Sequence, residues 1–175
     1  MPTRRQQKRK SELESARGVA QWIVVYQTYN AIFKVAELAL LSQRLSLPQL
    51  HVLAVLKKGG GLLTTGQIGQ AMVKASQTIT GLVDRLEEPG LVERVFDRKD
   101  RRKTWVRLTE KGERKLAEAS PVGARLAEEL SAVLSDEELQ DLEAKMEKLR
   151  SAAMNKLDEA LARQQPTPLS RRQVL

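Results

Sequence analysis

Apolar residues recur at helical spacing along most of the chain, which predicts a fold built mainly from α-helices. The first such stretch covers about residues 12–46. Its middle is apolar on most faces, so this helix needs more than one packing partner. A last long helix is predicted to reach about Arg163, with Ser135 and Glu138 as its capping box. Its apolar stripe consists of Leu139, Leu142, Met146, Leu149, Ala153 and Leu157.

Shorter elements fill the middle of the chain. A helix that begins at Pro48 ends at a run of three glycines, and a short strand follows at residues 62–64. Thr65 is predicted to cap the short helix TGQIGQAM. After a three-residue turn, Ser76 is predicted to cap a second helix, SQTITGLVDRLEE. Two runs that alternate between apolar and polar residues, at 91–96 and 104–108, then predict a β-hairpin. Thr109 can cap a further helix, which Pro121 allows to bend.

Two short helices with a tight turn, followed by a β-hairpin, are the order of a winged helix-turn-helix. Gly69 supplies the small residue that the contact between the two helices needs. The second helix has a polar face opposite its apolar stripe, and such a helix fits the DNA major groove with its N-terminal end nearest the base edges. The candidate DNA-contacting residues on this helix are Ser76, Gln77, Thr78, Thr80, Gly81 and Arg85.

Charge is distributed unevenly along the chain, whose net charge is +8. Five cations lie within the first ten residues. Residues 94–107 carry seven cations and two acids, whereas residues 126–147 carry eight acids and one lysine. One part of the molecule is therefore expected to attract polyanions and another to repel them.

The cationic tip of the hairpin is predicted to be the wing, which reaches a neighbouring minor groove where arginine suits the negative potential. Asp97 and Asp100 would moderate the repulsion and hold nearby arginines in place. A plain solubilising loop is the alternative interpretation. The candidate wing contacts are Arg98, Lys99, Asp100, Arg101, Arg102 and Lys103.

Composition argues against several other classes of protein. The chain has no cysteine and one histidine, so thiol chemistry is excluded and a metal site is not expected. Its glycine run lacks the lysine of a phosphate-binding loop, and no convincing acid–base pair is present, so we expect neither an enzyme nor a cofactor. No signal peptide is recognisable, and polar residues interrupt the apolar stretch 19–41. The sequence therefore predicts a cytoplasmic protein without a membrane span.

These features resemble the MarR (multiple antibiotic resistance regulator) family. The matching segments read LSLPQLHVLAVL, LLTTGQIGQAM and SQTITGLVDRLEEPGLVERVFDRKDRRKTWVRLTEKG. The most specific parts are LVDRLE with the following GLV, then DRKDRR and VRLTEKG. The resemblance is strong over about residues 45–119, and the long first and last helices match the family in length and order. Members of the family are homodimers that bind pseudo-palindromic DNA, usually as repressors, and small anionic, often phenolic ligands commonly release them.

The resemblance implies roles for individual residues. Asp100 and Arg102 match the signature acid and arginine of the family's wing, and Arg85 matches an arginine that often pairs with the wing acid. The chain departs from the family at Gly81, where many members carry a larger polar residue, which leaves the set of base contacts open. It departs less at Gly69, where alanine is usual.

The sequence thus predicts five segments. These are a disordered basic arm (1–10), a dimerisation helix (11–46), the winged helix-turn-helix (47–109), C-terminal dimerisation helices (110–163) and a tail (164–175). Trp22, Tyr26 and His51 are candidate ligand-binding residues between the dimer helices and the DNA-binding part, although the aromatic residues of the first helix also suit a dimer core.

The predicted function is that of a homodimeric transcriptional regulator that binds double-stranded DNA sequence-specifically. It is expected to be a repressor that a small ligand releases. Two alternatives remain at this point. A sequence-tolerant architectural DNA-binding protein would use the basic arm and tail, and a winged-helix module could bind a protein instead of DNA.

Overall fold

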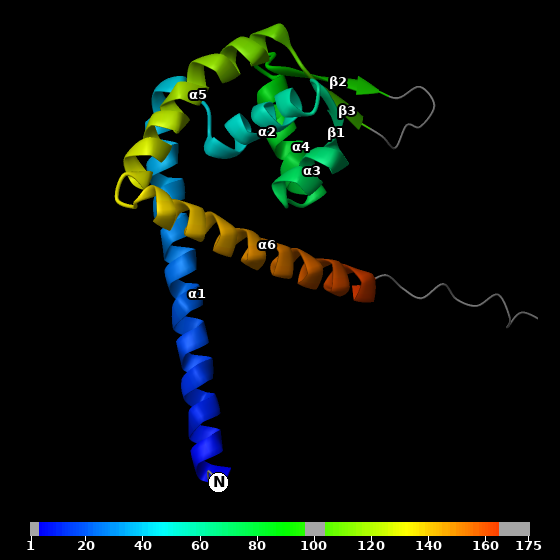
Figure 1. The fold of residues 1–175 in the computed structure, drawn as a ribbon. Coiled ribbons are helices and arrows are strands. Elements are labelled where there is room, and N and C mark those ends of the chain that lie inside the picture. Colours follow the sequence, from blue (N-terminus) through cyan, green and yellow to red (C-terminus); the bar gives the residue numbers. More distant parts are fainter. Residues whose placement is uncertain (1–3, 97–103, 165–175) are drawn as a thin grey trace, which may run out of the picture. The chain divides into compact units, whose positions relative to one another are not determined.

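The computed structural model describes residues 4–96 and 104–164 of the 175-residue chain. The chain is mainly α-helical with a small three-stranded antiparallel sheet, as the sequence predicts (Figure 1). It divides into two compact units, residues 1–127 and residues 128–175. No helix within the described ranges is long and apolar enough to span a membrane.

The first helix, α1, spans Arg4–Leu40, so both predicted boundaries of this helix are wrong. Residues 4–10 continue the helix instead of forming a disordered arm, because arginine, glutamine and lysine are good helix formers. At the other end, a 3-10 turn, η1 (Leu41–Gln43), follows α1, and Arg44 takes a left-handed conformation that closes the helix end. Leu40 is almost fully buried, whereas most apolar residues between Val19 and Leu38 are exposed.

Helix α2 (Leu47–Lys58) begins with a capping box between Ser46 and Gln49, and α3 (Thr65–Met72) with one between Thr64 and Gln67. The cap of α3 is thus Thr64 and not Thr65, because only Thr64 has a glutamine three residues ahead. Helix α4 (Ser76–Glu87) starts after Ala75, which is extended and makes no side-chain cap. The prediction that Ser76 caps α4 is therefore wrong by one residue.

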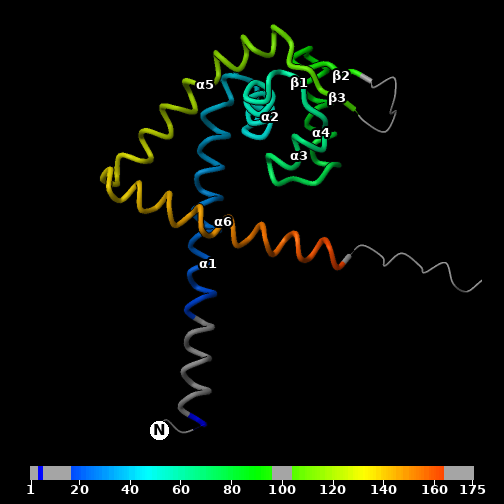
Figure 2. The backbone as a smooth tube through the Cα atoms, turned by 45° about the vertical axis from the view of Figure 1, so that its right-hand side comes forward, coloured from blue at the N-terminus to red at the C-terminus, as the bar shows by residue number. Residues whose placement is uncertain are grey.

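Helices α2, α3 and α4 gather at one end of α1, as the ribbon and the backbone tube show (Figures 1 and 2). The apolar stripe predicted for α4 is buried in their shared core. Gly69 allows α3 to approach the turn before α4, since a Cβ there would lie 2.9 Å from the carbonyl oxygen of Lys74. The core is formed mainly by Leu40, Leu50, Val52, Leu53, Leu56, Ile68, Ile79, Leu82, Val83, Leu86, Leu91, Val92, Val106 and Leu108.

The sheet consists of β1 (Leu62–Thr64), β3 (Thr104–Leu108) and β2 (Val92–Phe96), in that order. Within the hairpin, Val92 pairs with Leu108, Arg94 with Val106 and Phe96 with Thr104. Val92 and Val106 are buried, so this register turns the side of β2 that carries Arg94 toward the helices.

Helix α5 (Glu110–Ser131) begins directly after Thr109, whose Oγ1 accepts a hydrogen bond from the backbone N–H of Gly112 at 3.0 Å. Pro121 lies inside α5, which continues without a break. Helix α6 (Asp136–Gln164) has the predicted capping box: Ser135 Oγ accepts from Glu138 N at 3.3 Å, and Glu138 Oε2 accepts from Ser135 N at 2.9 Å.

Candidate nucleic-acid interface

The outward face of α4 is polar along its whole length, because the opposite face is buried in the core. Five of the six residues predicted to contact DNA on this helix are exposed: Ser76, Gln77, Thr78, Thr80 and Arg85. The sixth, Gly81, is half-buried, and a Cβ added there would meet no neighbouring atom within 4 Å. Packing therefore does not require glycine at position 81, and its missing side chain leaves open surface at the middle of the helix.

The hairpin that carries the predicted wing is described along its two strands, up to Phe96 and from Thr104. The candidate wing residues Arg98, Lys99, Asp100, Arg101, Arg102 and Lys103 lie outside the described residues. The pairing of Arg85 with Asp100 that the family resemblance implies involves the same segment and stays a prediction.

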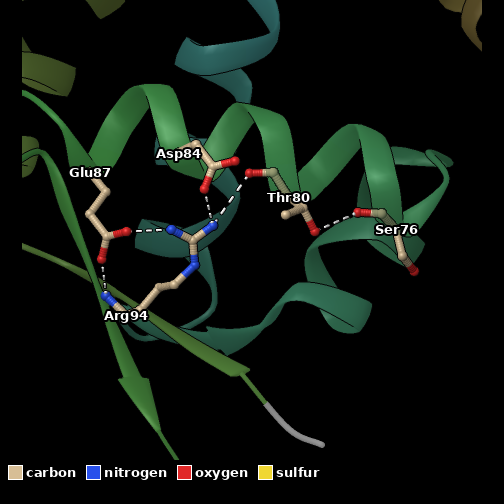
Figure 3. Close-up of polar contacts among 5 residues, drawn as sticks. All are labelled: Ser76, Thr80, Asp84, Glu87 and Arg94. Atoms are coloured by element: carbon tan, nitrogen blue, oxygen red, sulfur yellow. Dashed lines mark hydrogen bonds and ion pairs between the residues drawn. The ribbon is translucent and has the colours of Figure 1, made fainter.

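Arg94 joins the hairpin to α4, as Figure 3 shows. Its Nη2 atom lies 2.6 Å from Asp84 Oδ1 and 3.4 Å from the backbone oxygen of Thr80, and its Nη1 atom bonds Glu87 Oε2. The backbone N–H of Arg94 also donates to Glu87 Oε1 at 2.8 Å. One residue of β2 thus contacts α4 at three residues, Thr80, Asp84 and Glu87, which span its last two turns.

The charge of Arg94 is balanced within the protein. Burial disfavours the charged guanidinium, but the hydrogen bonds that it donates to Asp84 and Glu87 outweigh this effect, and the pKa of Arg94 is raised above its ordinary value. Arg94 therefore adds no net positive charge to the hairpin, because two carboxylates of α4 neutralise it.

Sequence reasoning did not identify this bridge, although one signal for it was present. Alternation along β2 places Arg94 on the same side as the apolar Val92, which is the side expected to face the helices. A cation on an inward-facing strand position needs acidic partners, and α4 provides two acids three residues apart, at Asp84 and Glu87.

The candidate ligand-binding residues are exposed and belong to two helices. Trp22 and Tyr26 lie one turn apart on α1 and are 60% and 67% exposed, and His51 is exposed on α2. The part of α1 that becomes buried begins at Ala36, roughly 20 Å further along the helix axis than Trp22. Among residues 4–96 and 104–164, no group of three or more acidic, histidine or cysteine side chains is arranged to hold a metal ion.

Comparisons with known proteins agree on one family. A family model described as "MarR family" matches residues 45–103. The transcriptional regulator HosA of Escherichia coli O127:H6 is 36% identical over 94 residues, which are 54% of this chain and 69% of HosA.

Solved structures show the same fold. A mutant of MarR from E. coli, complexed with operator DNA, superposes with a TM-score of 0.70 at 22% identity, over 76% of this chain and 95% of that one. The organohalide-sensing regulator RdhR-CbdbA1625, in its 2,4-dichlorophenol-bound form, gives a TM-score of 0.72 at 23% identity, over 77% of this chain and 80% of that one.

Proposed function

The chain belongs to the MarR family of DNA-binding transcriptional regulators, and from this premise we propose that it is a dimeric repressor that reads a pseudo-palindromic operator and is released by a small ligand. The observation that carries the proposal is the exposed polar face of α4, which its buried apolar stripe and Arg94 hold in a fixed orientation. A helix held in this way can enter a major groove with its N-terminal turn leading.

Each part of the interface has a distinct role in this proposal. Ser76, Gln77 and Thr78 lie at the N-terminal turn of α4, where side chains reach base edges and backbone N–H groups favour a phosphate. Arg85, on the next turns of the same face, would contact the backbone or the wing. The cationic residues 98–103 would enter the flanking minor groove, where arginine is favoured electrostatically.

Dimerisation is supported by apolar surface that one chain leaves uncovered. Val19, Trp22, Ile23, Val24, Tyr26 and Tyr29 are exposed on α1, and Leu142, Met146, Leu149, Leu157 and Leu161 are exposed on α6. Large apolar side chains gathered in this number on two helices are unusual for a monomer, so we assign both helices to the interface with a second copy. Two α4 helices related by a twofold axis would then meet successive major grooves about 34 Å apart.

Release by a ligand is supported more narrowly. RdhR-CbdbA1625 was solved with a chlorinated phenol, which is a small aromatic acid. Trp22, Tyr26 and His51 offer aromatic surface and polar tips for a ligand of that class at the junction of a dimer and its DNA-binding parts. The two α4 helices of a dimer would match the operator at one spacing and fail to match it at another. A ligand would release DNA only if it bound more tightly to the dimer with the mismatched spacing.

The proposal is tested by selecting DNA from a random duplex library with the purified chain at 150 mM salt. We expect an enriched inverted repeat with half-sites one helical turn apart. DNA retained without a motif would instead favour an architectural protein. If the chain retains no DNA even after removal of bound small molecules, a protein-binding winged helix becomes the better interpretation.

Salt dependence provides the first quantitative prediction. A dimer that neutralises roughly 8 phosphates should lose about a thousandfold or more in affinity for the selected duplex between 50 and 200 mM salt. Fluorescence anisotropy with the labelled duplex measures this change directly. A flat salt response would contradict the proposed phosphate contacts.

A further inference from the structure

The side-chain hydroxyl of Thr80 is engaged inside α4. Its Oγ1 donates a hydrogen bond to the backbone oxygen of Ser76, one turn earlier, at 3.0 Å (Figure 3). A threonine hydroxyl has a single hydrogen, so this bond removes the donor that could have met a base. The exposed side chain is left with an acceptor oxygen and a γ-methyl group.

Toward the C-terminus of α4, the positions next to Thr80 leave its side chain exposed. Gly81 adds no side chain, and the space where its Cβ would lie is open. Asp84, one turn later, has its carboxylate bound to Arg94 at 2.6 Å. Arg94 also donates to the backbone oxygen of Thr80 at 3.4 Å, which holds this part of the helix against the hairpin. At Thr80 and Gly81, the otherwise polar face of α4 therefore presents a methyl group beside open surface.

Within the major groove, one base edge suits contact with an exposed methyl group. The 5-methyl group of thymine projects into the groove and is read by apolar contacts, including those of threonine methyl groups. We propose that Thr80 is a specificity-determining residue that reads a thymine methyl group in each half-site through its γ-methyl group. The open surface at Gly81 admits the base edge. This inference rests on the proposed function, since it requires α4 to lie in the major groove.

The experiment uses the duplex selected above and two variants of the full chain. Each thymine of the half-site is replaced in turn by deoxyuracil, which lacks only the methyl group, and affinity is measured by anisotropy at 150 mM salt. For the wild-type chain we expect one position where the loss is about fourfold per half-site, the value for one buried methyl-sized group. The variant Thr80→Ser keeps the hydroxyl and should lose this discrimination. The variant Thr80→Val keeps a methyl group at the same place and should retain it.

The outcomes separate this inference from the function on which it rests. Selection without any enriched motif would overturn sequence-specific recognition and the role of Thr80 together. A motif whose affinity does not respond to deoxyuracil at any position would overturn the methyl contact alone, and so would a Thr80→Ser variant that still discriminates. Thermal unfolding of both variants verifies that they fold, which we expect because Thr80 is exposed.

Discussion

Gly112 lies at the start of α5, where the chain leaves no room for a side chain. A Cβ at this position would lie 2.0 Å from the backbone oxygen of Leu91 and 2.8 Å from Leu108 Cδ1. The substitution Gly112→Ala must therefore displace α5 from the turn that follows α4, and we expect it to lower the free energy of unfolding by at least about 2 kcal/mol. Urea unfolding at a fixed protein concentration measures the loss.

Gly123 provides a matched control on the same helix. A Cβ there meets no neighbour within 4 Å, so Gly123→Ala should be neutral or stabilising by up to about 1 kcal/mol, because alanine is the better helix former. Equal stability of the two variants would show that α5 can shift at no cost and that the close approach at Gly112 is not required.

At the scale of elements, the bridge from Arg94 to α4 sets how the hairpin meets this helix. The substitution Arg94→Ala removes the guanidinium from the carboxylates of Asp84 and Glu87, on the helix that we propose to face DNA; only the backbone N–H bond to Glu87 remains. We expect a loss of about 1–3 kcal/mol in unfolding free energy and weaker DNA binding, since both carboxylates would then repel phosphates. Lysine should not restore either property, because its single ammonium group cannot reproduce the arginine fork.

The control for Arg94 lies on the neighbouring strand. Arg107 forms an ion pair with Glu93 at 2.8 Å, and both side chains are about half exposed. Arg107→Ala should therefore change the unfolding free energy by less than about 1 kcal/mol. If Arg94→Ala and Arg107→Ala have the same effect on stability and on DNA affinity, the bridge has no special role in holding α4.

Local patterns predicted the type and order of the elements, because apolar periodicity, capping pairs and glycine turns act over a few residues. They succeeded for the buried stripe of α4 and for the capping box at Ser135 and Glu138. They failed where spatial neighbours decide. The end of α1 depends on how Leu40 packs, and the bridge of Arg94 joins residues ten positions apart on two elements. The need for glycine at position 112 likewise follows only from the approach of Leu91 and Leu108.

At the scale of the whole molecule, the uncovered apolar residues of α1 lie on more than one face. Val24 is 61% exposed and Tyr29 is 55% exposed. They are five positions apart, so the helical rotation places their side chains roughly 140° apart around the axis of α1. One flat partner surface cannot cover both side chains. In the proposed dimer α1 would therefore insert between elements of the second copy, so that disturbing either face should weaken self-association.

The double variant Val24→Glu with Tyr29→Glu tests this arrangement. It places a charge on each apolar face, and a twofold axis repeats the loss in the second copy. We expect self-association to weaken at least about a hundredfold, because burial of even one valine-sized side chain per chain is lost twice. Sedimentation equilibrium of the full chain measures the change. Affinity for the inverted repeat should fall in parallel, because two half-sites would no longer be bound by one linked pair.

The variant Gln21→Glu with Gln27→Glu adds the same two charges at exposed polar positions of α1, and it should remain dimeric. A dimer that persists in the first variant would mean that the apolar faces of α1 are covered in some other way, and the proposed role of α1 as a dimerisation helix would then be wrong.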